Sequence, residues 1–179
     1  MLLIFVLNQT NTIMKNYVEI DETVMASRGQ RFANYIIDSI VYYLIIFFIG
    51  FLAGALFTYF DYDGMYLWIV GMGQWGQIAF NLTVMALYFM FMEGFTQRTV
   101  GKFITGTIVI MEDGSRPEAG VAALRTLCRF IPFEPFSFFG TPARGWHDTI
   151  TKTYVIDRKK YNEALELKQS FDQIGAEEI

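Results

Sequence analysis

Three polar side chains stand at the start of the most apolar stretch of the chain, and their types suit the binding of a cation or a proton. Asn34 and Asp38 follow Arg31 by three and seven residues. Seven residues of α-helix turn through about 700°, so all three side chains project from one face. A carboxylate inside an apolar span is costly without a partner, and such groups are functional by default. The spacing predicts that Asp38 binds a cation or a proton with Arg31 as its counter-ion; the alternative is a structural ion pair that fixes the depth of the helix.

A second carboxylate with candidate chemistry is Asp148, which lies in a Gly-Trp-His-Asp turn ahead of a strand-like segment. It could reach Arg31 or Arg125, or cap a helix or turn, as aspartates in turns commonly do. The neighbouring His147 is the only histidine of the chain and has no nucleophile beside it. We therefore expect an exposed interfacial histidine that is neither catalytic nor metal-binding.

Amide side chains form a further polar stripe in the second apolar stretch. Gln74, Gln77 and Asn81 fall, together with Tyr88, within an arc of about 60° on a helix. Since lipid cannot satisfy such groups, they predict either the lining of a polar path or hydrogen bonds between helices. Asn34 is a candidate lining residue of the same kind in the first stretch.

Two apolar segments have the length needed to carry these side chains across a bilayer. Residues 30–57 predict the first helix: the 18 residues from Ile40 to Phe57 carry no charge or amide and would span about 27 Å, against ~30 Å of hydrocarbon. Residues 67–92 predict the second helix, and the acidic, aromatic residues 58–66 predict a turn between them. Consecutive antiparallel helices joined by a short turn are neighbours, so we expect a hairpin.

The distribution of charge orients this hairpin. All 14 lysines and arginines lie outside residues 32–97, and the charged residues inside that interval are Asp38, Asp61, Asp63 and Glu93. Because Lys and Arg collect on the cytoplasmic side of membrane helices, both flanks are predicted to be cytoplasmic and the turn external.

A third apolar segment, residues 118–139, is broken by Pro132 and Pro135. About 14 residues of helix precede the first proline, too few to cross a bilayer. We expect an interfacial or re-entrant helix, with Arg125 and Arg129 on one face directed towards lipid phosphate groups.

Two strand-like segments and two polar ends complete the predicted organisation. The alternating residues 104–110 and the segment TKTYVI at 151–156 predict two strands that pair on the cytoplasmic side. Residues 1–13 look like an upstream mis-start or a loose tail, and the polar C-terminal residues predict a frayed helix or disorder. The predicted units are an N-terminal tail over 1–27, a membrane domain over 28–157 and a polar C-terminal tail over 158–179.

Composition argues against several classes of function. A single cysteine, Cys128, leaves no internal disulfide and no Cys-rich metal site. A net charge of -4 without a basic patch argues against nucleic-acid binding. Gly101 and Lys102 lack the spacing and the following hydroxyl of a phosphate-binding loop. We expect no catalytic residue, no metal and no cofactor, and the chain is predicted not to be an enzyme.

Three motifs in order, RFANYIIDSI, RTVGKFITGTIVI and RGWHDTITKTYVI, resemble the RDD family of bacterial membrane proteins. The resemblance covers residues 28–157 and places the one arginine and two aspartates that name the family on Arg31, Asp38 and Asp148. It implies a multi-pass protein of the bacterial inner membrane, in a family loosely associated with ion transport.

The predicted fold is of the all-α membrane class: two transmembrane helices as a hairpin, a short interfacial or re-entrant proline-broken helix, and a small cytoplasmic-side strand pair. The predicted function is cation- or proton-linked transport by a cluster of Arg31, Asp38 and Asp148 at the cytoplasmic mouth. Two spans cannot enclose a path, so the expected partners besides the lipid bilayer are further copies of the chain or another membrane protein. The alternative is a non-catalytic accessory or scaffold protein that docks a partner subunit.

Overall fold

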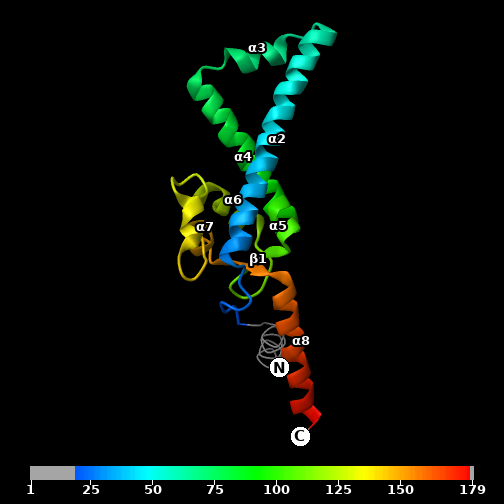
Figure 1. The fold of residues 1–179 in the computed structure, drawn as a ribbon, viewed down its shortest axis with the longest axis vertical. Coiled ribbons are helices and arrows are strands. Elements are labelled where there is room, and N and C mark those ends of the chain that lie inside the picture. The colour runs from blue at the N-terminus through cyan, green and yellow to red at the C-terminus, as the bar shows by residue number, and fades with distance from the viewer. Residues whose placement is uncertain (1–18, 178–179) are drawn as a thin grey trace, which may run out of the picture.

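The computed structural model describes residues 19–177 as an elongated, mostly helical molecule (Figure 1). Among these residues, two helices are long and apolar enough to cross a membrane, α2 (Arg28–Phe60) and α4 (Gln74–Thr96). In the most apolar 18-residue stretch of each helix, only 6% (α2) and 17% (α4) is buried within the chain. The core helix of a soluble protein is mostly buried, so these two helices differ from it. The prediction of two apolar helices of membrane-crossing length is confirmed. The interpretation of residues 1–13 lies outside the described residues.

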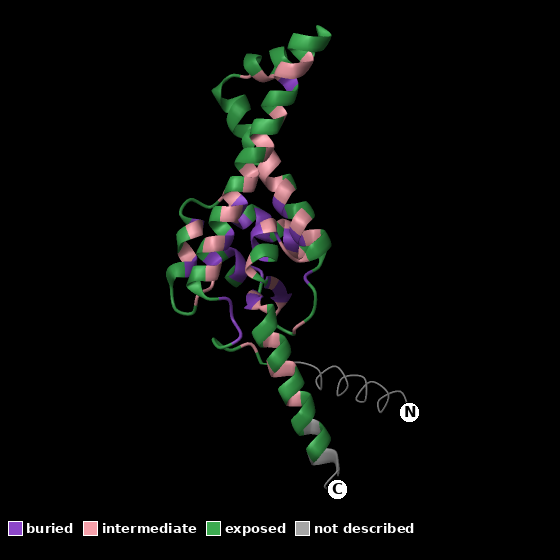
Figure 2. Cartoon of the chain, turned by 45° about the vertical axis from the view of Figure 1, so that its right-hand side comes forward, coloured by how far each residue is buried: buried purple, intermediate pink, exposed green. Residues whose placement is uncertain are grey.

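Helix α2 begins at Arg28 because the preceding residue caps it. The Ser27 hydroxyl accepts a hydrogen bond from the Gln30 amide, and the Gln30 side chain accepts one from the Ser27 amide. The helix runs for 33 residues to Phe60, and its C-cap residue, Asp61, has a left-handed φ of 50°. The polar face near its start is buried, whereas the apolar surface beyond it is mostly exposed (Figure 2).

The second span is shorter than the sequence predicts. The predicted helix over 67–92 is divided into α3 (Gly64–Gly71) and α4, with Met72 and Gly73 between them in extended conformations. Glycine is a poor helix former; Gly71 is the last residue before the break, and Gly73 lies within it. Helix α3 crosses from the far end of α2 to the start of α4 (Figure 1), so α4 alone, with 23 residues, returns to the base of the hairpin.

A small antiparallel sheet lies at this base, and its pairing confirms the predicted strand pair. Strand β1 (Thr107–Met111) pairs with β2 (Thr153–Asp157). The segment ahead of α2 adds a bridge between Met25 and Ile156, so it lies along the other edge of β2. The small apolar core at the sheet consists of Ala26, Val109 and Val155.

A short helix, α5 (Val100–Thr105), occupies the start of the predicted strand 104–110. The Thr99 hydroxyl accepts a hydrogen bond from the Lys102 amide at its beginning. Gly106, at a φ of 72°, ends the helix in a left-handed conformation that glycine adopts without strain. The strand therefore starts only at Thr107.

The remaining elements surround the base of α2 and α4. Helix α6 (Ala119–Cys128) has 10 residues, too few to cross a bilayer, and a 3₁₀-helix, η1 (Glu134–Phe139), follows it. Helix α7 (Trp146–Ile150) leads into β2. The predicted polar tail is a 20-residue helix, α8 (Arg158–Glu177), which extends away from the rest of the chain (Figure 1).

Candidate functional site

The buried polar side chains gather at one end of the hairpin, where α2 begins and α4 ends. Figure 2 shows that buried positions concentrate at this end, around which α5, α6, α7 and the sheet are arranged. Arg31, Asp38 and Asp148, the three residues selected from the sequence, are all buried there.

Asp38 is held by neutral donors rather than by a cation. Its Oδ1 accepts hydrogen bonds from the Tyr88 hydroxyl and the Gly101 amide, each at 2.8 Å. Its Oδ2 accepts one from the Thr99 hydroxyl at 2.6 Å, and the residue is 5% exposed. The predicted counter-ion, Arg31, pairs elsewhere. Seven residues of helix separate Arg31 and Asp38 by about 10.5 Å along the axis, so sharing a face did not bring them together.

Gly101 allows α5 to approach α2 closely enough for this arrangement. A Cβ at this position would lie 2.6 Å from the carbonyl oxygen of Asn34 and 2.9 Å from its Cα, distances that side chains do not adopt. Asn34 is itself buried, and its amide donates to the Thr107 hydroxyl at 3.0 Å. The candidate lining residue Asn34 therefore joins α2 to the start of β1.

Asp148 is the partner of Arg31. Its Oδ2 lies 2.6 Å from Nη1 of Arg31, and its Oδ1 lies 2.7 Å from Nη1 of Arg125 and 3.2 Å from Nε2 of His147. Burial alone would raise the pKa of this carboxyl, but Arg31, His147 and Arg125 together hold the pKa well below its usual range. Asp148 reaches both arginines that the sequence offered as alternatives, and its charge is fixed by them.

The cluster with the most ion pairs centres on Glu93, a residue that the sequence analysis did not select. Its Oε1 lies 2.6 Å from Nζ of Lys102 and 2.7 Å from Nη2 of Arg129, while Oε2 lies 2.8 Å from Nε of Arg125. Burial lowers the pKa of Lys102, and Glu93 opposes that shift. Arg125 thus joins the Glu93 and Asp148 clusters into one network.

These contacts correct the expected direction of two arginines. Arg125 and Arg129 were expected to point towards lipid phosphate groups, but both point inward to Glu93, and Arg125 is 0% exposed. A buried carboxylate on α4 needs cationic partners, and two arginines four residues apart on α6 supply them. The signal available in the sequence was that Glu93 is the last acid of the cation-free interval.

His147 is buried between two carboxylates instead of being exposed as predicted. Its Nδ1 contacts Glu134, its Nε2 faces Asp148, and the residue is 5% exposed. Each of its two ring nitrogens therefore faces one carboxylate. Burial would raise the pKa of Glu134, but the hydrogen bond and charge of His147 lower it.

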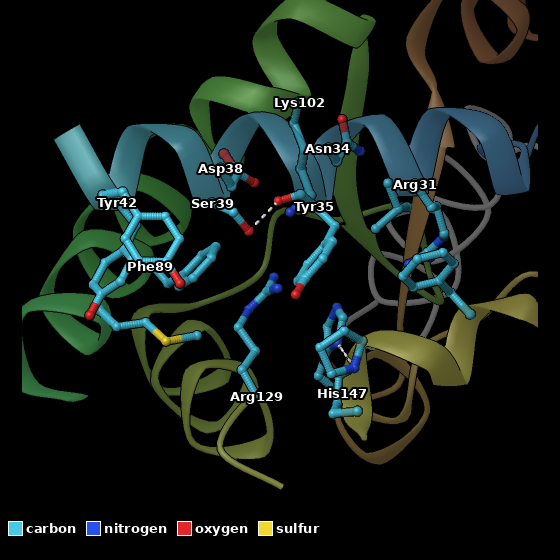
Figure 3. A pocket seen from close by; sticks show the side chains of 16 residues that line it. Arg31, Asn34, Tyr35, Asp38, Ser39, Tyr42, Phe89, Lys102, Arg129 and His147 are labelled. Atoms are coloured by element: carbon cyan, nitrogen blue, oxygen red, sulfur yellow. Dashed lines mark hydrogen bonds and ion pairs between the residues drawn. The ribbon is translucent and has the colours of Figure 1, made fainter. Parts of the chain in front are cut away.

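A cavity of about 230 Å³ borders this network (Figure 3). Its charged lining consists of Arg31, Asp38, Lys102, Arg129, Glu134 and His147. Its aromatic lining consists of Tyr35, Tyr42, Tyr43, Phe89 and Phe138. In Figure 3, Asp38 comes from α2 on one side, while Arg129 and His147 face it from the opposite side. Both kinds of lining therefore meet in one space.

The three amides predicted as polar lining lie outside this cavity. Gln74, Gln77 and Asn81 are exposed on α4. Gln77 donates to the carbonyl of Met72 at 3.3 Å, and the backbone carbonyl of Asn81 accepts from the Tyr42 hydroxyl at 3.5 Å. The structure therefore brings Arg31, Asn34, Asp38 and Asp148 to one region and leaves these amides on the surface.

The charged side chains of the base are arranged as ion pairs and hydrogen bonds. Within residues 19–177, no group of three or more His, Cys, Asp or Glu side chains is placed to hold a metal ion. The carboxylates fall into two kinds: Glu93 and Asp148 are each paired with several cationic groups, whereas Asp38 is held by neutral donors.

A hairpin of two apolar helices on a buried ionic base defines the class of a small helical membrane protein. Among family models, that of the RDD family matches residues 25–152. The chain belongs to the RDD family, which confirms the resemblance carried by the three sequence motifs. Comparison with the curated proteins and with the solved structures gave no match.

Proposed function

We propose that the chain takes part in proton- or cation-linked transport across a membrane, with Asp38 as the exchangeable group. The observation that carries this proposal is the environment of Asp38: a carboxylate that borders a cavity and receives its hydrogen bonds from Tyr88, Thr99 and Gly101. A carboxylate held by neutral donors can take up a proton or a cation without breaking an ion pair. Such an acid within a membrane helix is a functional group by default.

The ion-paired residues have a supporting role in this proposal. Arg31 and Asp148 fix the position of α2 against α7, and the contact between His147 and Glu134 lies beside the same cavity. No covalent step is proposed, and the chain acts as a non-enzymatic protein.

The proposed location is the bacterial inner membrane, with both ends of the chain on the cytoplasmic side. All lysines and arginines flank residues 32–97, and the positive-inside rule then places the ionic base in the cytoplasm and α3 outside. Two spans do not enclose a path, so transport requires several copies of the chain or another membrane protein.

The test is ion flux in liposomes that contain the purified full-length chain and a pH-sensitive dye, challenged with Na⁺ and with K⁺. Asp38→Asn is expected to abolish most of the dye response while the protein still elutes as the wild type does in mild detergent. Asp61→Asn is the matched control, because Asp61 is an exposed carboxylate at the far end of α2 and its left-handed conformation suits asparagine. Equal flux from wild type and Asp38→Asn would refute the role of Asp38.

The second candidate function is a non-catalytic accessory protein that docks a partner subunit. The observation that favours it is the extent of ion pairing around Glu93 and Asp148, which suits a rigid structural base. Oligomeric state in mild detergent separates the two functions. A monomer without ion flux in liposomes supports the accessory role, and an oligomer with flux that depends on Asp38 supports transport.

A further inference from the structure

The buried ionic network contains more hydrogen-bond donors than the chain satisfies. Across residues 19–177, the buried side-chain nitrogen and oxygen atoms that lack a hydrogen-bond partner are all guanidinium nitrogens. They are Nε and Nη2 of Arg31, Nη2 of Arg125, Nε of Arg129 and Nε of Arg144. Leaving a buried donor unpaired is unfavourable, most of all on a charged group. The network therefore calls for an added acceptor.

The unpaired donors of Arg31 and Arg129 belong to side chains that line the cavity. Arg31 is 5% exposed and uses only Nη1, in its pair with Asp148. The carboxylates of the cavity are already engaged, Asp38 by three donors and Glu134 by His147. A molecule that enters the cavity with a hydrogen-bond acceptor would satisfy these donors.

The charge of the lining favours an anion. The groups that border the space are Arg31, Lys102, Arg129 and His147 together with the carboxylates Asp38 and Glu134. Asp148 and Glu93, which pair with the three Lys and Arg side chains, are not among the lining residues. Guanidinium groups bind phosphate through several parallel N–H···O bonds, so two arginines with spare N–H groups suit a phosphate in particular.

The aromatic side chains that line the cavity point to an amphiphilic ligand. Tyr35 and Tyr43 border the cavity from α2 and are 45% and 68% exposed on the outer surface of that helix. Phe89 borders it from α4. Figure 3 shows Phe89 and Tyr42 grouped at one end of the cavity and Arg31 and His147 at the other. A ligand that fills both ends has one charged group and an apolar remainder.

We propose that the cavity binds the phosphate group of an anionic phospholipid through Nε and Nη2 of Arg31 and Nε of Arg129, while Nη2 of Arg129 keeps its ion pair with Glu93. Its acyl chains lie along the aromatic surface of α2 and α4. This lipid site is independent of the transport proposal: lipid can bind without ion flux, and ion flux can occur without lipid.

The experiment is native mass spectrometry of the full-length chain in mild detergent. Phosphatidylglycerol, phosphatidylcholine and inorganic phosphate are each added at equal concentration. We expect adducts of phosphatidylglycerol well in excess of those of phosphatidylcholine, which carries the same phosphate but no net charge. Inorganic phosphate is expected to bind more weakly than phosphatidylglycerol, because it leaves the aromatic lining unfilled.

Two variants locate the adduct in the cavity by different means. Arg129→Gln removes one donor but leaves Glu93 paired with Lys102 and Arg125, and it is expected to lower phosphatidylglycerol binding roughly tenfold. Ser39→Leu keeps every charge and fills part of the cavity, which Ser39 lines, and is expected to lower binding as well. Arg158→Gln removes an exposed arginine at the start of α8 and is expected to leave binding unchanged.

Thermal melting of each variant shows whether it folds, and only folded variants are compared. Phosphatidylglycerol binding that both Arg129→Gln and Ser39→Leu weaken supports the site. Equal binding of phosphatidylglycerol and phosphatidylcholine overturns it, as does binding that neither folded variant changes. If inorganic phosphate binds strongly and phosphatidylglycerol does not, the site takes free phosphate, and the proposal of a lipid ligand is overturned.

Discussion

The two ends of the hairpin are stabilised in different ways. At the far end, α2 and α4 diverge and α3 joins them, with the stacked rings of Phe57 and Tyr66 at 4.8 Å among the contacts between α2 and α3 (Figure 1). Large apolar side chains such as Phe47 and Phe51 are more than half exposed there. At the base, the same two helices are joined to α5, α6 and α7 through buried ion pairs.

The difference follows from the surroundings that each end is built for. Apolar side chains gain little by packing on one another when the alternative is lipid, so a far end that exposes them needs few internal contacts. Buried charges have no such alternative and must find partners within the chain. The protein therefore concentrates its specific contacts in the base, and substitutions there are expected to have the larger effects.

The largest expected effect comes from the arginine that links the two acidic clusters. Arg125→Met removes a cation from both Glu93 and Asp148 and is expected to destabilise the fold by about 3–5 kcal/mol. The measurement is the amount of monodisperse protein and its melting temperature in detergent. Arg158→Met, at an exposed position, serves as the control and is expected to change little. Equal melting temperatures for the two variants would mean that the network adds nothing to stability.

A smaller effect is expected from Gly101→Ala, which tests the close contact between α5 and α2. The new Cβ would lie 2.6 Å from the carbonyl oxygen of Asn34, so α5 must move away at a cost of about 1–3 kcal/mol. That movement also lengthens the hydrogen bond from the Gly101 amide to Asp38. Melting temperature and hydrogen exchange of the Gly101 region measure the change. An unshifted melting temperature with protected α5 amides would contradict the contact.

The smallest effect is expected at the far end. Gly50→Ala adds a Cβ with nothing within 4 Å of it, so the stability of the chain is expected to change by less than about 0.5 kcal/mol. Cross-linking and size-exclusion measurements check whether a second copy packs on this surface. A marked loss of stability or of an oligomer in Gly50→Ala would show that the far end also depends on close helix contacts.

Local patterns in the sequence sufficed for the two apolar helices and the pairing of the two strands. Helix boundaries were harder to predict, since Gly71, Met72 and Gly73 divide a segment that the sequence analysis took as one continuous helix. Helical periodicity also placed Arg31 and Asp38 on one face, and both are buried at the base.

Which charged residues pair with each other was harder to predict than which residues lie on one helix face. The pairing of Arg31 with Asp148 depends on how distant segments fold together, and a shared helix face says nothing about it. The same holds for Glu93, whose three cationic partners come from α5 and α6. His147 was predicted to be exposed because the sequence gives it no nucleophile and no metal-ligand partner, whereas its contact with Glu134 on η1 arises only in the fold.

The strand bridge ahead of α2 has a mechanical consequence. Met25 pairs with Ile156, and Gln30 in the first turn of α2 donates to Asp157, the last residue before α8, at 2.8 Å. The start of α2 is thereby joined to the start of α8. A displacement of α8 would therefore act, through Ile156 and Asp157, on the first turn of α2, where Arg31 lies.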